Sequence, residues 1–232
     1  HTIQRRSVVP TAASPWVFRS TAQAHPEREA RRNPVPPRPL AACGSKKKSL
    51  RKNAREALVF QDETEVHLHP TLTRMWAPVG AQPEVRAPGQ NIKKTVYGGV
   101  DYATGKITYR MADTKSGVNF LEFLQTLTRA YAGRKICLVC DNARFHLTKA
   151  VREWLAANSD KLEIFWLPPY CPTLNLIERL WGHLKRTVLA NVLYRSIDDL
   201  VDAFCRGIGT INGHRCKMDF IFDHDGDVRK IA

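Results

Sequence analysis

Three acidic residues stand where packing alone gives little reason for an acid. Asp62 closes the apolar run LVFQD, and Asp141 closes the apolar run KICLVCD. Glu178 lies at the border of an apolar stripe in a helical segment. One such acid is unremarkable, because surface acids are common. Two acids at the same end of neighbouring strands, with a glutamate on a helix beside them, form the pattern of a metal site.

The residue types indicate which metal and which chemistry. Hard divalent cations such as Mg²⁺ take oxygen ligands and few protein carboxylates, which leaves positions for water and phosphate oxygens. Two such ions roughly 4 Å apart can activate an attacking oxygen and stabilise a leaving one in phosphoryl transfer. We therefore predict a site for two Mg²⁺ or Mn²⁺ ions. For Glu178 taken alone, an ordinary surface ion pair stays open as an alternative.

The elements that must position these acids follow from the hydrophobic pattern. Strands are predicted at 57–63, at 73–83 before a turn, twice within 92–113, at 135–141 and at 162–167. Helices are predicted at 118–133, at 146–159, from Thr173 through about Leu189, and at 196–211. Three antiparallel strands followed by alternating helices and strands indicate an α/β fold, a mixed sheet with helices on both faces.

The helix that carries Glu178 has a clear apolar stripe, formed by Leu174, Ile177, Trp181, Leu184 and Val188. At 100° per residue, Glu178 lies about 90° from the centre of that stripe. Lys185 falls on nearly the same line as Glu178. We therefore expect Glu178 to face a cleft at the edge of the sheet, with Lys185 reaching toward a DNA phosphate.

Three segments are more specific together than apart: QDET (61–64), DNARFH (141–146) and LPPYCPTLNLIERLWGHLKR (167–186). Together they resemble the catalytic domain of mariner-superfamily transposases, in the bacterial insertion-sequence branch, over about residues 56–205. The resemblance implies a ribonuclease-H-like fold and an Asp-Asp-Glu triad of metal ligands, formed by Asp62, Asp141 and Glu178. It implies two-metal cleavage of DNA at the ends of an element, followed by transfer of the 3′-hydroxyl strand.

The same resemblance suggests partners and a location. DNA, both as element ends and as target, is the expected partner, and synapsis of two ends favours a homodimer. The expected location is the bacterial cytoplasm, in association with the nucleoid. We expect no membrane partner, since no run of eighteen apolar residues occurs and the first residues contain no continuous apolar stretch.

The same resemblance implies that Asn142 and His146 lie close to Asp141 and contact DNA. Asn175, Lys185 and Arg186 are also expected to contact DNA. For His146, orientation of metal-bound water and a purely local role at the start of its helix stay open. Asn175 could instead hold its loop. On a strand, Glu63 and Glu65 face away from Asp62, so neither is expected to be a ligand.

The positive charge of the chain is concentrated near its beginning. Residues 1–55 carry 13 Lys and Arg against two Glu, and seven of the 14 prolines. We expect an irregular basic arm, or a remnant of a DNA-binding region, in which Lys46, Lys47 and Lys48 contact DNA. A solvated segment without a partner is the alternative. The catalytic domain is expected at 56–212 and a polar tail at 213–232.

The chain also departs from the family pattern. Residues 1–55 do not resemble the helix-turn-helix region of the family, Cys171 replaces a usual serine, and Leu176 replaces a common proline. Two alternatives to an active transposase therefore remain. One is a catalytically idle remnant that only binds DNA, and the other is a different ribonuclease-H-like nuclease such as a junction resolvase.

Overall fold

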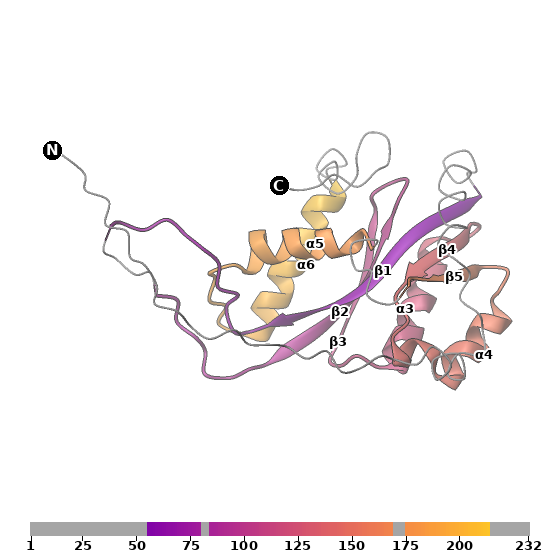
Figure 1. The fold of residues 1–232 in the computed structure, drawn as a ribbon, viewed down its shortest axis with the longest axis horizontal. Coiled ribbons are helices and arrows are strands. Elements are labelled where there is room, and N and C mark those ends of the chain that lie inside the picture. The colour runs from indigo at the N-terminus through magenta and orange to yellow at the C-terminus, as the bar shows by residue number, and fades with distance from the viewer. Residues whose placement is uncertain (1–54, 80–83, 169–174, 214–232) are drawn as a thin grey trace, which may run out of the picture. The chain divides into compact units, whose positions relative to one another are not determined.

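A five-stranded mixed sheet forms the centre of the fold (Figure 1). The structure is a computed structural model that describes residues 55–79, 84–168 and 175–213, all within one compact unit, Pro37–Ala232. The strands are β1 (Glu56–His67), β2 (Lys93–Asp101), β3 (Ile107–Ala112), β4 (Lys135–Cys140) and β5 (Leu162–Trp166). Their order is β3-β2-β1-β4-β5. β1, β2 and β3 pair antiparallel, whereas β4 and β5 run parallel to β1. The predicted mixed sheet is confirmed.

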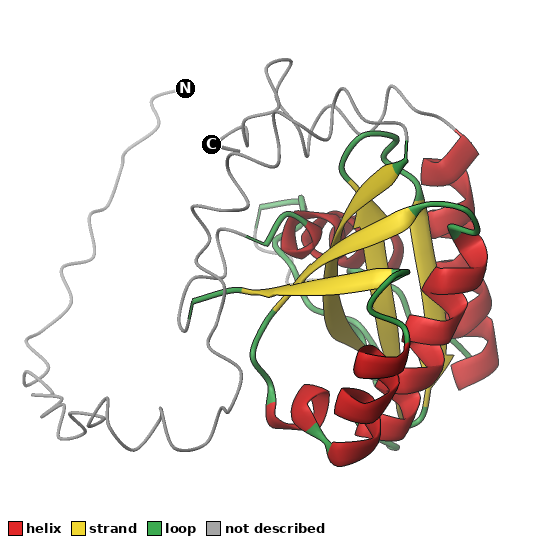
Figure 2. Ribbon diagram, turned by 90° about the vertical axis from the view of Figure 1, so that its right-hand side faces the viewer, coloured by secondary structure: helices red, strands yellow, loops and turns green. Residues whose placement is uncertain are grey.

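Helices cover both faces of the sheet (Figure 2). One face carries α3 (Gly117–Ala130), the short 3₁₀ helix η1 (Arg144–Leu147) and α4 (Lys149–Ala157). The other carries α5 (Ile177–Leu184), its continuation as the π-helical turn η3 (Lys185–Leu189), and α6 (Ile197–Gly213). The predicted helices at 118–133, 146–159 and 196–211 therefore exist with small shifts at their ends.

β1 divides the apolar core into two halves, because successive strand residues point to opposite faces. Leu58 and Phe60 pack toward α5 and α6, in a cluster with Ile177 and Phe204. Ala57 and Val59 pack toward α3 and α4, in a cluster that contains Phe120. Asp62 shares the face of Phe60, and Glu63 shares the face of Val59. This alternation decides which helices each acid meets.

The strand predicted within 73–83 is wrong for the residues that the structure describes there. Among the described residues, the one β-bridge nearby is isolated and joins Thr71 and Ala190. Met75 and Trp76 are exposed, so no apolar face exists against which a strand could pack. β1 is longer than predicted, because β2 pairs with it as far as His67. Residues 80–83 lie outside the described part.

The helix predicted to start at Thr173 begins at Ile177. Its first turn is closed by the N–H of Glu178, which donates to the carbonyl oxygen of Asn175 at 3.2 Å. Several predictions fall outside the described residues: the basic arm up to residue 54 with Lys46, Lys47 and Lys48, the loop at 169–174 with Cys171 and Thr173, and the tail from residue 214. Within the described part, no helix has the length and apolar character needed to cross a membrane.

Candidate functional site

Strand register brings Asp62 and Asp141 to one edge of the sheet. The parallel ladder between β1 and β4 pairs residues as far as Phe60 with Val139. Asp62 and Asp141 each lie two residues beyond that last pair. The two acids therefore stand at the same level on neighbouring strands, just past the end of this parallel ladder. Asp141 directly follows the end of β4, as predicted, but the prediction that Asp62 closes its strand is wrong, because β1 continues to His67.

A glycine allows the helix of Glu178 to reach the same edge. Gly98 of β2 pairs with Asp62. A Cβ atom on Gly98 would lie 2.4 Å from Cη2 of Trp181, which is closer than atoms can pack. The indole of Trp181 therefore occupies the space that any other residue would fill. Since Trp181 is one turn beyond Glu178, this contact sets the height of the glutamate above the sheet.

An open groove of about 680 Å³ lies along this edge. Its lining includes Asp62, Glu178, Lys115 and Lys185. Glu178 is exposed, so packing does not fix its rotamer. Asp141 is not part of this lining, and its side chain is 54% exposed. The expectation that Glu178 faces a cleft with Lys185 on the same side is met by this geometry.

The pKa of Asp62 reflects its burial and the acids that lie near it. Burial raises the pKa of Asp62 to about 7, and the negative charges of Glu178, Glu63 and, more weakly, Asp141 add to this shift. The ionised carboxylate is therefore disfavoured at this site. A divalent cation would remove this penalty, because its charge reverses the local preference for the neutral form.

The three acids supply the type of ligand atom that a hard cation prefers. Asp62, Asp141 and Glu178 supply only carboxylate oxygens, the ligands that Mg²⁺ and Mn²⁺ favour. Among the described residues, however, no three His, Cys, Asp or Glu side chains already converge as ligands around one point. The acids are thus gathered at one edge without forming a closed coordination set.

A chain of buried polar groups lies behind the acids. The Nε2 of Gln61 donates to Oε1 of Glu63 at 2.6 Å, and Nε2 of His146 lies 3.0 Å from the same oxygen. The Nδ1 of His146 lies 3.1 Å from both Oδ1 and the backbone oxygen of Asp141. Since both ring nitrogens face only acceptors, both carry a proton in this arrangement.

The pKa values of His146 and Asp141 follow from their contacts within this hydrogen-bonded group. Burial lowers the pKa of His146, but the hydrogen bonds to Asp141 and Glu63 outweigh it and raise the value to about 9. Burial raises the pKa of Asp141, whereas the hydrogen bond and charge of His146 bring it below its usual value. The N–H of Ala143 and the charge of Lys115 act in the same direction. Asp141 is therefore the acid held in its ionised form.

Two residues expected to contact DNA point into the protein. The side chain of His146 is fully buried, and Asn175 is buried with its Nδ2 donating to the carbonyl oxygen of Gln61 at 2.8 Å. Their burial does not favour direct contact with DNA, so for both this remains a prediction without support from the geometry. Asn142 is partly buried. Arg186 is exposed beyond Lys185.

Lys115 is a residue of the groove that sequence reasoning missed. It is exposed in the loop between β3 and α3. That loop is fixed, because the hydroxyl of Tyr97 accepts from the N–H of Ser116 at 2.8 Å, and Ser116 caps α3. No period or motif marks Lys115. Only the position of its loop, next to the end of the antiparallel β1–β2 pair, could have singled it out.

Comparison with known proteins finds a matching family and two relatives. A family model described as "DDE superfamily endonuclease" matches residues 57–201. The insertion element IS630 uncharacterized 39 kDa protein of Shigella sonnei is 33% identical over 140 residues, which are 60% of this chain and 40% of that protein. The uncharacterized protein y4pE/y4sA of Sinorhizobium fredii is 29% identical over 73 residues, 32% of this chain and 50% of that protein.

Solved structures show the same fold. The Mos1 transposase paired-end complex with left transposon end matches with a TM-score of 0.54 and 17% identity, over 96% of this chain and 68% of that one. The mariner Mos1 paired-end complex with Mg matches with a TM-score of 0.52 and 18% identity, over the same shares. The expected ribonuclease-H-like fold is confirmed. The chain spans half or less of the length of the two relatives above.

Proposed function

Since the chain belongs to the DDE superfamily endonucleases, we propose that Asp62, Asp141 and Glu178 bind two divalent cations and cut DNA at the ends of an insertion element. One observation carries this proposal. The charges of Glu178 and Asp141 both act on Asp62, whose pKa is raised to about 7 by burial and by neighbouring acids. Carboxylates that repel each other at an open groove fit a site whose charge is completed by cations.

Each group in the groove has a part in this reaction. The cations, when bound, supply activation of the attacking oxygen and stabilisation of the leaving oxygen. Asp62, Asp141 and Glu178 hold them, and no side chain acts as a nucleophile. Lys115 and Lys185 line the same groove and hold the phosphates on either side of the cut. The freed 3′-hydroxyl then attacks a phosphodiester of target DNA in the same groove, which forms a new P–O bond as the 3′-oxygen of the target strand leaves.

DNA is the proposed partner. The net charge of the chain is +14, so binding to a polyanion is favoured and depends on salt. The solved structures of similar fold include a Mos1 complex with a transposon end and a Mos1 strand transfer complex. These similarities mean that this chain shares its fold with the protein in those DNA complexes.

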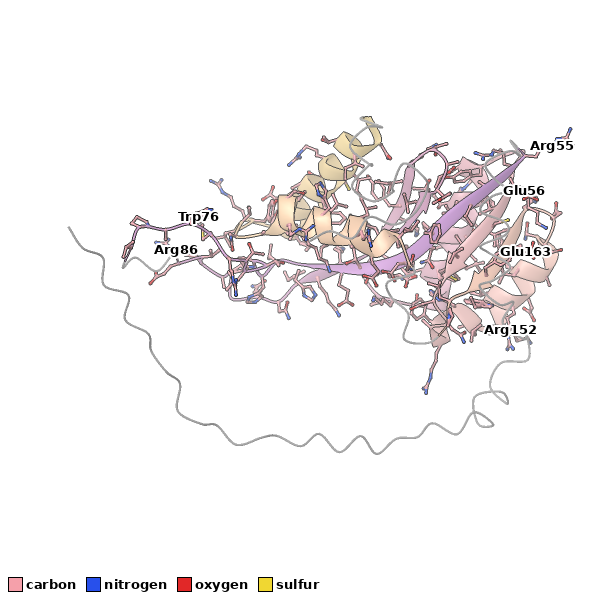
Figure 3. All side chains as sticks on the ribbon, turned by 45° about the horizontal axis from the view of Figure 1, so that its top comes forward. Arg55, Glu56, Trp76, Arg86, Arg152 and Glu163 are labelled. Atoms are coloured by element: carbon pink, nitrogen blue, oxygen red, sulfur yellow. The ribbon has the colours of Figure 1, made fainter. Side chains whose placement is uncertain are left out.

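A second copy of the chain is the other proposed partner. The segment between β1 and β2 exposes Leu72, Met75 and Trp76, and Trp76 is 100% exposed (Figure 3). Large apolar side chains gathered on one exposed segment are a common sign of a protein interface. This supports the homodimer expected from synapsis of two element ends.

Cleavage of supercoiled plasmid carrying the element ends tests the proposal. We expect Mg²⁺- or Mn²⁺-dependent nicking by the wild-type chain. Asp141→Asn should reduce it by at least about 100-fold, because several kcal/mol of transition-state stabilisation depend on the cations. DNA binding should survive. Asp160→Asn, an exposed acid after α4, is the matched control and should leave nicking unchanged.

The same assay separates the alternatives. Nicking that persists in Asp141→Asn would contradict the proposed site. A wild-type chain that binds DNA and never nicks it would favour the idle remnant. A chain that nicks branched DNA without joining a 3′-hydroxyl to a target would favour another ribonuclease-H-like nuclease.

A further inference from the structure

One buried hydrogen-bonded chain connects all three segments that carry the acids. We propose that Glu63 and His146 are positioning residues, which hold the Asp141 carboxylate so that one of its oxygens is left for a cation. This inference rests on the proposed function. It concerns residues behind the groove and assigns them no contact with DNA or with the reacting atoms.

His146 is a rigid support. Its side chain is fully buried, and its ring lies 4.1 Å from the ring centre of Phe120 and 4.2 Å from that of Phe145. Aromatic rings on two sides restrict rotation of the imidazole. The ring nitrogens therefore keep fixed directions, one toward Asp141 and the other toward Glu63.

Asp141 needs such a support because β4 ends at Cys140. Its backbone is outside the sheet, and its side chain is half exposed. Two groups hold the carboxylate, and both use the same oxygen: Nδ1 of His146 at 3.1 Å and the N–H of Ala143 at 3.2 Å contact Oδ1. Among the described residues nothing contacts Oδ2 by hydrogen bond or ion pair. One oxygen is thus fixed to the protein and the other is available to a cation.

Glu63 connects this support to β1. It follows Asp62 directly, yet its side chain lies on the opposite face and is 3% exposed. The pairing of Glu63 with His146 joins residues 83 positions apart. Asn175 extends the chain to the segment before α5 by donating to the carbonyl oxygen of Gln61. Groups that orient ligands from behind in this way change metal affinity when they are removed.

A merely structural ion pair would use the same contacts, so the test must measure more than stability. His146→Asn places an amide near the position of Nδ1, toward Asp141, and loses the contact with Glu63. His146→Gln places its amide near the position of Nε2, toward Glu63, and loses the contact with Asp141. Both variants lose an aromatic ring in the same place, so they form a matched pair.

The experiment is titration of the full chain with Mn²⁺, in which electron paramagnetic resonance measures the free ion, beside thermal unfolding of each variant. We expect His146→Gln to weaken Mn²⁺ binding about 10- to 100-fold, the usual effect of losing a group that orients a ligand. We expect His146→Asn to retain tighter binding than His146→Gln. Asp101→Asn, which removes a buried charge paired with the partly exposed Arg134 at the opposite end of β2, should lower stability without changing Mn²⁺ affinity.

Two results would overturn the inference: wild-type Mn²⁺ affinity in His146→Gln, or equal losses in both His146 variants that follow stability as in Asp101→Asn. Asp62→Asn distinguishes this failure from failure of the proposed function. If Asp62→Asn leaves Mn²⁺ binding unchanged, the three-acid site itself is wrong and the inference fails with it. If Asp62→Asn abolishes binding while His146→Gln does not, only the role of His146 is wrong.

Discussion

At the scale of single residues, the buried Asp62 carboxylate lowers the stability of the folded protein without metal. Burial and the charges of Glu178 and Glu63 raise its pKa to about 7, from an ordinary value of 3.8. In the folded protein without metal, Asp62 therefore keeps its proton to about neutral pH, whereas the unfolded chain releases it near pH 4. Between these values the folded state binds more protons, so stability falls as pH rises.

Asp62→Asn removes this penalty without changing the shape of the side chain. We expect the variant to unfold at a higher temperature than wild type at pH 8 in EDTA, and the difference to disappear toward pH 4. The shift should amount to a few degrees, since a domain of this size gains roughly 2–4 °C for each kcal/mol. Thermal unfolding across the pH range measures it. Equal melting temperatures at every pH would show that the pKa of Asp62 is not raised in the folded protein.

The sequence allows Asp62, Asp141 and Glu178 to be singled out, because acids at the ends of apolar segments conflict with packing. It does not allow the role of Glu63 to be seen. Alternation along β1 correctly places Glu63 away from Asp62, but its partner is His146, 83 residues later. A hydrogen bond between such distant residues leaves no periodic signal. For the same reason, the inward direction of His146 was not predictable.

At the scale of elements, the approach of α5 to β2 decides where Glu178 lies. Gly98 and Trp181 form the contact, and Ile177 also lies 3.3 Å from the position of a Cβ on Gly98. The helix is otherwise held by apolar contacts of its buried face, such as Leu180 and Leu184. The position of Glu178 thus depends on a residue of β2 that touches no reacting group.

Gly98→Ala should displace Trp181 and move Glu178 away from Asp62. We expect a loss of about 1–3 kcal/mol in the free energy of unfolding, because overpacking of a core costs that much. Mn²⁺ affinity and nicking should fall as well. Gly209→Ala on the exposed side of α6 is the control, where a Cβ meets nothing within 4 Å. Unchanged Mn²⁺ affinity in Gly98→Ala would mean that this contact does not position Glu178.

Most elements were predictable from the sequence, because each has either a clear apolar period or a continuous apolar run. β4 is apolar on both faces and lies between β1 and β5, as its sequence indicates. The strand prediction was wrong over the described residues 73–79, since short apolar runs indicate a strand only where a partner exists to cover them. The π-helical end of α5, Lys185–Leu189, has no signature in the stripe of apolar residues.

At the scale of the whole molecule, the exposed segment between β1 and β2 bears on assembly. Trp76 contributes the largest apolar side chain there and is fully exposed. We expect the wild-type chain to form a dimer in light-scattering measurements after gel filtration, and Trp76→Ser to shift the mass toward that of a monomer. Val118→Ser, which changes an exposed apolar residue on α3, is the control. A mass that does not change in Trp76→Ser would exclude this segment as the interface.

The claim that joins all three scales is that Asp62, Asp141 and Glu178 share metal ions. The most direct measurement is diffraction from crystals of the wild-type chain with Mn²⁺, with anomalous scattering recorded to locate the ions. We expect anomalous peaks in the groove, coordinated by carboxylate oxygens of all three acids and by the Oδ2 of Asp141 rather than its Oδ1. Peaks that lack Glu178 as a ligand, or that lie on the face of Glu63 and His146, would contradict it.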